Sequence, residues 1–264
     1  MNEPRVESPG FATCQLYGMT LARLDTEGLL DQVFGALAQG RGGWVITANL
    51  DFLRRHARDA DARALYDAAD IRVADGMPLV WAARLQGDRL PERVAGSSLV
   101  GHIAERAARE GRSLYFLGGA PGASARAAEV LRARAPSLRV LGTSSPRLSD
   151  PPAPAEYEPL RDELARLGPD ILLVGLGSPK QERLIGALRT ALPATWMMGV
   201  GVPFSFLAGD VRRAPRWMQR SGLEWVHRLS QEPRRLARRY LVEDLPFSLA
   251  LFAHALRHRH RGAR

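Results

Sequence analysis

The chain has 264 residues, of which 45% are hydrophobic and 25% are charged, a balance that is typical of globular proteins and excludes wholesale disorder. This length predicts one large α/β domain, or one domain with an appendage. Cys14 is the single cysteine, which excludes an intrachain disulfide framework and a zinc site of several cysteines, and favours the cytoplasm.

The excess positive charge lies at one end of the chain. The formal net charge is +9, and residues 211–264 carry all of it, with 13 arginines and 4 acidic residues. Residues 1–210 hold 24 basic and 24 acidic residues and are neutral overall. We therefore predict an α/β core over residues 1–210 and a basic C-terminal appendage over residues 211–264, whose partner is an anionic surface or polymer.

No targeting or membrane-spanning segment is expected. Residues 1–14 contain no apolar stretch of signal-peptide length, and no stretch of the chain approaches the ~20 apolar residues that cross a bilayer. The most apolar candidate, residues 246–256, is long enough to lie on a membrane but not to span it.

In chain order, the predicted elements alternate between strands and helices. Residues 11–24, with Gly18 at the middle, predict a hairpin. Apolar runs that predict buried strands cover residues 44–49, 71–75, 113–119, 170–177 and 195–201, with a weaker run at 138–142. Helical patterns such as residues 122–135 lie between them. This alternation predicts an α/β fold with a parallel sheet between helices.

Two later segments differ from this pattern. Residues 144–159 hold five prolines and predict a surface loop. Arginine-rich helices are expected from about residue 214 to 231 and, with Pro233 at a first helical position, to about residue 257.

Candidate ligand contacts lie at the carboxyl ends of the predicted strands, the edge where open parallel sheets bind ligands. The polar and glycine residues there include Thr47, Asn49, Asp75, Gly118, Gly119, Gly175, Gly177, Ser178, Gly199 and Gly201. Glycines allow close approach of a ligand, and the following helix N-termini favour an anion such as a diphosphate. Each turn alone is also an ordinary connection, but several at one edge favour a site.

Asp75 is the candidate catalytic residue of this edge. A carboxylate between a strand and the following glycine, Gly76, can cap a helix, hold a metal ion or act as a general base. The spacing alone favours the cap and leaves the base open.

No metal or cofactor is predicted. Asp59 and Asp61 match a DxD metal-binding pattern, but they lie in an alanine-rich helical stretch where capping the helix start is favoured. The histidines show no HExxH pattern. Without a metal ion, arginines and backbone amides would neutralise the charge of a bound phosphate. Gly118–Gly122 does not match the dinucleotide-binding fingerprint, and the segment 175–180 lacks the spacing of a Walker A motif. Neither Cys14 nor the serines lie in a motif that suggests a covalent nucleophile.

Lys180, the single lysine, is followed by Gln181 and Glu182 directly after a predicted strand. These three side chains suit either a polar ligand or a charged first helical turn. The appendage combines arginines with apolar residues such as Trp217, Trp225 and Tyr240. Three interpretations remain open for it: a membrane-surface helix, an RNA-binding segment, or a solvated face beside a core seam.

Seven ordered motifs resemble the WecG/TagA/CpsF family of bacterial glycosyltransferases over about residues 12–245. The matching segments are TANLD at 47–51, ADGMP at 74–78 with WAAR at 81–84, ERVAG at 92–96, LYFLGG at 114–119, GLGSPKQE at 175–182, GVG at 199–201 with FLAG at 206–209, and RAPRWM at 213–218 running into GLEW at 222–225 and EPRR at 232–235.

The resemblance implies a Rossmann-like core and inverting, metal-independent transfer from a UDP-sugar, without a cofactor, to a sugar on an undecaprenyl diphosphate lipid at the cytoplasmic membrane face. Donors in the family include N-acetylmannosamine, its uronic acid and glucose. By motif, Asp75 would be the base, and the appendage would close over the site.

The resemblance also implies roles for other residues of this chain. Pocket or substrate contacts would be Thr47, Asn49, Arg93 and Gln181, and the appendage arginines would be Arg228, Arg235 and Arg238. Ser205 stands where many members carry an aspartate and Pro203 where they carry a small residue. This departure leaves the choice of donor open.

Two other classes of function remain as alternatives to a glycosyltransferase. One is a nucleic-acid binder that uses the arginine-rich appendage, and the other is a nicotinamide-dependent oxidoreductase. The favoured interpretation has the membrane and not nucleic acid as partner. A homo-oligomer is also left open.

Overall fold

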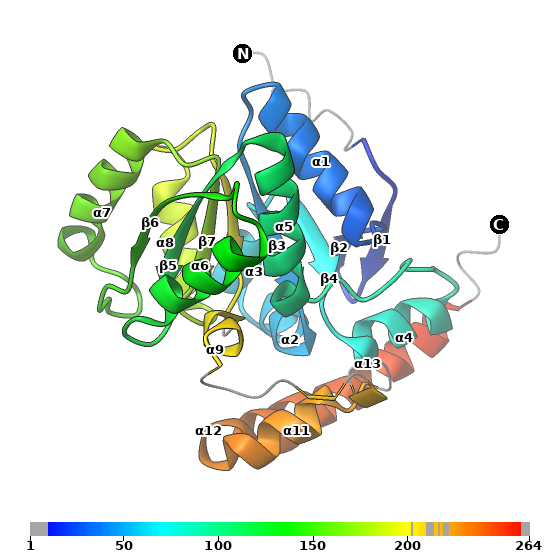
Figure 1. Cartoon of the computed structure of the whole chain (residues 1–264). Coiled ribbons are helices and arrows are strands. Elements are labelled where there is room, and N and C mark those ends of the chain that lie inside the picture. Colours follow the sequence, from blue (N-terminus) through cyan, green and yellow to red (C-terminus); the bar gives the residue numbers. More distant parts are fainter. Residues whose placement is uncertain (1–9, 202, 210–213, 216, 219–221, 260–264) are drawn as a thin grey trace.

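The computed structural model describes residues 10–201, 203–209, 214, 215, 217, 218 and 222–259. Near the N-terminus, strands β1 (Thr13–Leu16) and β2 (Met19–Ala22) form an antiparallel hairpin (Figure 1). Tyr17 and Gly18 both have positive φ, 49° and 88°, as a two-residue turn between twisted strands requires. The predicted hairpin is confirmed.

A six-stranded sheet forms the centre of the molecule, and all of its neighbouring strands are parallel, in the order β4-β3-β8-β7-β5-β6. The strands are β3 (Gly43–Ala48), β4 (Ile71–Ala74), β5 (Ser113–Gly118), β6 (Arg139–Ser144), β7 (Ile171–Gly175) and β8 (Trp196–Gly199). All six apolar runs are therefore strands, and the predicted α/β fold with a parallel sheet is confirmed.

Helices cover both faces of the sheet, which explains why the strands are almost continuously apolar. On one face lie α1 (Thr26–Ala38), α5 (Gly96–Glu110), α6 (Ala123–Arg134) and α9 (Pro203–Leu207). On the other lie α2 (Leu50–Arg58), α3 (Ala60–Asp67), α4 (Met77–Gln86), α7 (Pro154–Leu167) and α8 (Lys180–Leu188). In β3, Trp44 and Ile46 enter one core cluster and Val45 enters the other.

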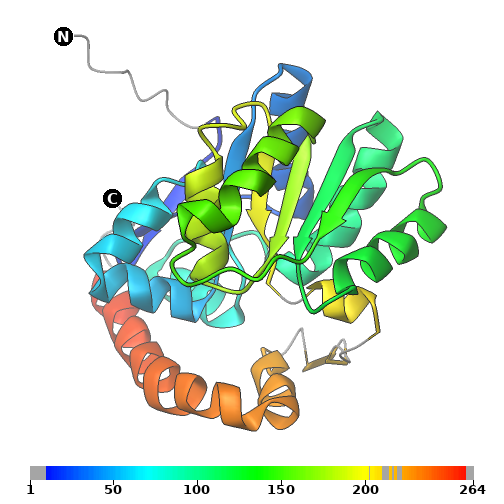
Figure 2. The same cartoon turned by 90° about the vertical axis from the view of Figure 1, so that its left-hand side faces the viewer.

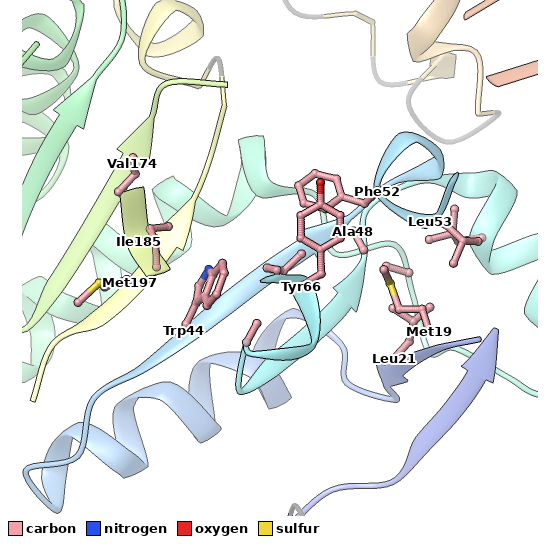
Figure 3. Close-up of a cluster of buried hydrophobic side chains, with 14 of the residues drawn as sticks. Met19, Leu21, Trp44, Ala48, Phe52, Leu53, Tyr66, Val174, Ile185 and Met197 are labelled. Atoms are coloured by element: carbon pink, nitrogen blue, oxygen red, sulfur yellow. The ribbon is translucent and has the colours of Figure 1, made fainter. Parts of the chain in front are cut away.

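The larger core cluster joins the hairpin to the sheet and to several helices. Figure 3 shows Trp44 and Ala48 of β3 beside Phe52 and Tyr66 of the following helices, with Met19 of the hairpin nearby. Trp44, Tyr66 and Met19 have no exposed surface. This packing fixes the hairpin and the helices after β3, and with them the carboxyl end of β3.

Two sequence predictions need correction. The proline-rich loop ends earlier than expected, because α7 begins at Pro154 and includes Pro159. Proline is tolerated at a helix start, and the Glu156 carboxylate accepts the N–H groups of Ser149 and Ala153 there.

The helical structure expected from about residue 214 to 231 is interrupted, although Trp217 and Met218 are helical. Ala214 and Pro215 are not helical, and α11 (Glu224–Gln231) begins only after Gly222, which has a φ of 72°. A left-handed residue ends a right-handed helix, so the chain turns at Gly222 before α11 begins.

The C-terminal appendage lies along the edge where the sheet strands end (Figure 2). After α11 the chain continues through α12 (Pro233–Ala237), the π-helical turn η1 (Arg238–Asp244) and α13 (Leu245–His258). Phe247, Leu251 and Ala255 of α13 are buried in the same core cluster as α4. The last helix of the appendage is thus packed into the core, whereas α11 has no buried residue.

Candidate functional site

A cavity of about 360 Å³ lies between the carboxyl ends of three adjacent strands and the C-terminal appendage. Asn49 follows β3, Asp75 follows β4 and Val200 follows β8, and all three line it. The appendage supplies the opposite wall from α11, η1 and α13. The site therefore combines core and appendage, as a ligand site at the carboxyl edge of a parallel sheet predicts.

Asp75 projects into this cavity from the end of β4. Its N–H donates to the carbonyl oxygen of Ala48 over 2.7 Å, and its Oδ2 accepts the N–H of Gly96, the first residue of α5, over 3.1 Å. The residue that caps α4 is Gly76, so the expectation that Asp75 caps the following helix is wrong. The carboxylate instead meets the positive end of α5.

Gly96 allows this approach. A Cβ at position 96 would lie 2.9 Å from Oγ1 of Thr47 and 3.7 Å from Oδ2 of Asp75. Thr47 is buried and does not line the cavity, and its hydroxyl packs close to Gly96 at the start of α5. The predicted contact between Thr47 and substrate stays a prediction.

The charges around Asp75 act in opposite directions. Burial raises the pKa of the Asp75 carboxyl to about 6, and Glu224 adds to the rise. Arg93, the N–H of Gly96 and Arg228 oppose it. A carboxyl group with this pKa is ionised at neutral pH and is more basic than an ordinary aspartate, which suits a general base.

Arg93 lies on the loop between α4 and α5, where the N–H of Val94 donates to the carbonyl oxygen of Ala74 at the end of β4. Its Nη1 donates to Oε2 of Glu224 over 2.8 Å, and both side chains are mostly buried. This ion pair joins the core to the first turn of α11. The sequence analysis assigned no role to Glu224.

Asn49 caps the start of α2, because its Oδ1 accepts the N–H groups of Asp51 and Phe52. The guanidinium of Arg239, on η1, also reaches this oxygen, over 3.5 Å. Asn49 therefore lines the predicted pocket and has a structural role there. Its contact with substrate stays a prediction.

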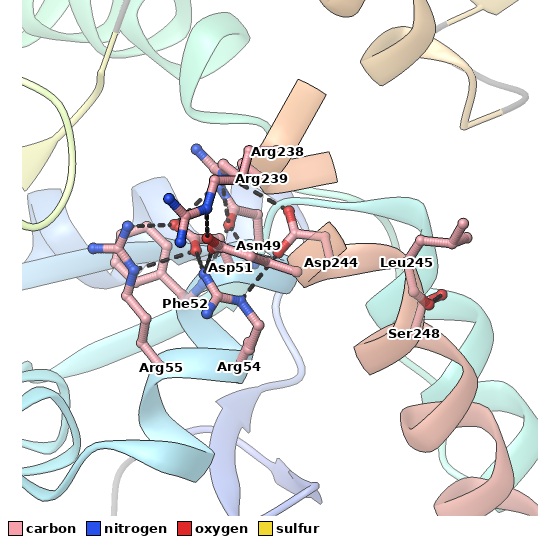
Figure 4. A network of polar contacts seen from close by, with 11 residues as sticks. Asn49, Asp51, Phe52, Arg54, Arg55, Arg238, Arg239, Asp244, Leu245 and Ser248 are labelled. Carbon is pink, nitrogen blue, oxygen red and sulfur yellow. Dashed lines mark hydrogen bonds and ion pairs between the residues drawn. The ribbon is translucent and has the colours of Figure 1, made fainter. Parts of the chain in front are cut away.

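A network of ion pairs connects α2 to η1 at the rim of the cavity (Figure 4). Asp51, which is 1% exposed, pairs with Arg54 at 2.5 Å, with Arg55 at 3.0 Å and with Arg239 at 3.4 Å. Asp244 pairs with Arg54 at 3.3 Å and with Arg239 at 3.5 Å. Asp51 and Asp244 are buried, so the loss of an arginine partner would leave a buried carboxylate without compensation, and the network connects η1 to α2 through these pairs.

Aromatic side chains form much of the remaining wall. Trp225 of α11 and Tyr240 of η1 meet edge to face with ring centres 6.0 Å apart. Trp81 of α4 lines the cavity from the side of the core. Gly222 packs on Trp81, because a Cβ at position 222 would lie 2.7 Å from its ring. The chain thus passes over α4 in close contact just before α11 begins.

Besides Thr47, five predicted binding residues do not line the cavity: Gly118, Gly177, Lys180, Gln181 and Glu182. Lys180 donates to the carbonyl oxygen of Leu148 over 2.7 Å. Gln181 is buried, and its Oε1 accepts the N–H of Gly201 while its Nε2 donates to Glu182. Burial raises the pKa of Glu182 to about 7. Gln181 and Glu182 therefore brace the turn after β8.

The two glycines of that group have local explanations. Gly118 has a φ of 99°, and a Cβ there would lie 2.6 Å from the carbonyl oxygen of Gly175. The side chain of Phe204 covers Gly175 itself. Gly177 has a positive φ and open space around it. Binding roles for Gly118 and Gly177 remain predictions.

The predicted appendage arginines lie in different places. Arg228 lines the cavity, and no ion pair is found for it among the described residues. Arg238 has an 86% exposed side chain outside the cavity, whereas its neighbour Arg239 lines it. The side chain of Arg235 is outside the described residues, as is that of Pro203, while Ser205 is partly buried in α9. Neither Arg239 nor Asp51 was predicted as a site residue from the sequence.

Asp59 is the residue that caps α3, since its Oδ1 accepts the N–H groups of Asp61 and Ala62. The capping interpretation of the DxD pattern is confirmed. Within the ranges that the structure describes, no group of three or more His, Cys, Asp or Glu side chains could hold a metal ion. Burial raises the pKa of the Cys14 thiol to about 11, so this cysteine is a poor nucleophile.

Together, the parallel sheet and the cavity at its carboxyl edge define a Rossmann-like α/β protein whose candidate ligand site has one wall from the C-terminal appendage. A family model described as "Glycosyl transferase WecG/TagA/CpsF family" matches residues 14–261. The chain belongs to this family of glycosyltransferases, and the resemblance of its motifs is thereby confirmed.

Proposed function

We propose that the protein is an inverting glycosyltransferase that needs no metal ion and moves a hexose-type sugar from a UDP-sugar to an acceptor sugar on a polyprenyl diphosphate lipid. Such a reaction belongs to the synthesis of a cell-surface polysaccharide or teichoic-acid-type polymer at the cytoplasmic face of the membrane. Family membership supports glycosyl transfer, and the chemistry of the cavity supports the finer assignment.

One observation carries the proposal: Asp75 is the cavity carboxylate without an ion pair among the described residues. The other carboxylates of the lining, Asp51, Glu224 and Asp244, each pair with an arginine. A carboxylate that is free of ion pairs and reaches the cavity can accept a proton from an acceptor hydroxyl.

In the proposed reaction, Asp75 takes the proton of the acceptor hydroxyl as its oxygen attacks the anomeric carbon from the side opposite UDP. The bond from that carbon to the diphosphate oxygen breaks, and its electron pair leaves with UDP, so the configuration inverts. Arg93, Arg228 and Arg239 line the same cavity and would neutralise the diphosphate. Because arginines can do this, the proposal requires no cation.

The exposed apolar surface supports a membrane-bound acceptor. Large hydrophobic side chains of the appendage that are exposed are Trp217, Leu223, Trp225, Val226, Leu241, Val242, Leu245, Leu249 and Leu256. Among the described residues, the remaining exposed large hydrophobic side chain is that of Trp81, which lines the cavity. No helix in the described ranges has the length and apolarity to cross a bilayer. Apolar side chains beside arginines suit an anionic membrane surface.

Thermal unfolding with UDP, compared with NAD, tests the proposed function. UDP at about 100 times its Kd would stabilise the protein by about 2.7 kcal/mol and raise Tm by roughly 5 to 10 °C. A rise with NAD alone would favour the oxidoreductase, and salt-sensitive RNA binding without a UDP effect would favour the nucleic-acid binder. UDP release across a panel of UDP-sugars, with a short-chain lipid diphosphate acceptor, then identifies the donor.

Replacing Gly222 by alanine is expected to weaken UDP binding without unfolding the core. The new Cβ would lie 2.7 Å from the Trp81 ring and 3.0 Å from Cβ of Met77, so the start of α11 has to move away from α4. The left-handed backbone adds about 1 kcal/mol of strain. The measurement is UDP affinity together with Tm.

Gly111→Ala is the matched control for this variant, because Gly111 has a φ of 66° and nothing within 4 Å of the added Cβ. It carries similar backbone strain without the clash. Equal UDP affinity in Gly222→Ala and Gly111→Ala would contradict a role for the contact between Gly222 and Trp81.

A further inference from the structure

The ion pair between Arg93 and Glu224 lies beside the proposed base. Arg93 comes from the core and Glu224 from the first turn of α11, and both line the cavity with Asp75. The side chains are 16% and 17% exposed. Such a pair is little screened by solvent, so its charges act strongly on their neighbours.

Charged groups reach Asp75 from every element around it. The loop before α5 supplies Arg93, and α11 supplies both Glu224 and Arg228. Farther along the lining, α2 supplies Asp51 while η1 supplies Arg239 and Asp244, which are paired with one another. Glu224 is therefore the negative charge that balances two guanidinium groups next to Asp75.

Without Glu224, the guanidinium of Arg93 would have Asp75 as its available carboxylate partner in this part of the cavity. A carboxylate held by arginine has a lowered pKa and is a weak base, and its oxygens are occupied. The bond from Arg93 to Glu224 prevents this pairing. It also fixes Arg93 at the cavity wall, where a diphosphate would approach.

Resting on the proposed function, we infer that Glu224 is a positioning residue: it holds Arg93 away from Asp75, so that the Asp75 carboxylate stays free and basic toward the acceptor hydroxyl. The appendage then contributes to catalysis through a carboxylate as well as through arginines. Glu224 touches neither the hydroxyl nor the anomeric carbon in this scheme and acts through Arg93.

The test is Glu224→Gln in the full-length chain, since glutamine can still accept the hydrogen bond from Arg93 but carries no charge. Titration of Asp75 is followed by ¹³C NMR of the carboxyl groups, with the Asp75→Asn spectrum assigning the signal. The expected result is that the pKa of Asp75 falls from about 6 toward the ordinary value of 3.8. In activity assays, kcat/KM at neutral pH should fall about tenfold, with its acid limb shifted to lower pH.

Two further variants make the result specific. Glu105→Gln removes the same charge from α5, far along the helix from Gly96, and should leave the pKa of Asp75 and kcat/KM unchanged. Glu224→Asp keeps the charge and should restore most of the wild-type pKa, which also provides a reading if Glu224→Gln does not fold. UDP affinity should stay close to the wild-type value in Glu224→Gln, because glutamine still accepts the hydrogen bond from Arg93 and Arg93 exchanges one carboxylate neighbour for another.

Lower UDP affinity and lower Tm with an unchanged Asp75 pKa would overturn the inference and leave Glu224 as a structural contact. The titration needs no substrate, so its outcome is separate from that of the proposed function. If Asp75→Asn is inactive but Glu224→Gln leaves the pKa in place, the inference alone fails. If the pKa falls but no UDP-sugar is turned over, the proposed function alone fails.

Discussion

Replacing Asp75 by asparagine is expected to lower kcat at least a hundredfold while leaving UDP affinity nearly unchanged. Asparagine has almost the same shape and can still accept the N–H of Gly96, but it cannot take a proton from the acceptor. Loss of a general base typically costs ~10²–10⁴-fold in rate. The measurement is UDP release under saturating donor and acceptor, together with UDP binding.

The pH dependence provides an internal check on the same residue. The base form of Asp75 is the ionised one, and its pKa of about 6 lies above the ordinary 3.8, so kcat/KM should fall as pH drops below 6 and level off above it. Asp59→Asn is the matched control, because asparagine caps a helix as well as aspartate does and Asp59 lies outside the cavity. Near-normal kcat in Asp75→Asn would remove Asp75 from the role of base.

The sequence predicted the sheet and the place of Asp75 because both depend on local patterns. Continuous apolar runs identified the strands, and the polar residues after each run mark one edge of any parallel sheet. Asn49 and Asp75 come together because β3 and β4 are neighbours with matching ends. Arg93 follows, since its loop is bonded to the end of β4.

Other parts of the site depend on contacts between distant segments, which the sequence pattern does not specify. Glu224 and Arg239 enter the cavity only because the appendage folds back onto α2 and α4. Arg239 lines the cavity and Arg238 is exposed, and which of the two adjacent arginines faces inward depends on how η1 packs on α2. Gln181 and Glu182 look like ligand contacts in sequence, but they pack beneath Gly199, where any Cβ would lie 2.5 Å from the Gln181 amide.

The prolines and glycines also show that a sequence pattern can leave the local structure unspecified. Five prolines predicted a loop over residues 144–159, yet Pro154 begins a helix because a first helical residue needs no N–H donor. The arginine-rich pattern predicted helical structure from about residue 214 to 231, yet Gly222 has a left-handed φ and packs against Trp81. In both cases the residue type allows two structures, and tertiary packing selects one.

The appendage should lose its affinity for anionic vesicles when its most exposed apolar side chains are replaced by serine. Trp217, Val242 and Leu249 are 63%, 66% and 67% exposed, and none of them lines the cavity. Val242 lies in η1, and Leu249 lies in α13 between the buried residues Phe247 and Leu251 of the same helix. These exposed apolar side chains would enter the headgroup region while arginines meet the lipid phosphates.

Each lost side chain removes about 1 kcal/mol or more of apolar burial, so the triple serine variant should bind vesicles at least a hundredfold more weakly. Cosedimentation with vesicles that contain anionic lipid measures this, and neutral vesicles report the electrostatic part. The rise in Tm with UDP should persist, because the cavity lining is intact, and that result serves as the folding control.

Deleting residues 211–264 is a poorer experiment than the triple variant, since the deletion would also remove Phe247 and Leu251 from the core and the appendage wall from the cavity. Wild-type vesicle binding by the triple variant would show that these three side chains do not bring the protein to its acceptor.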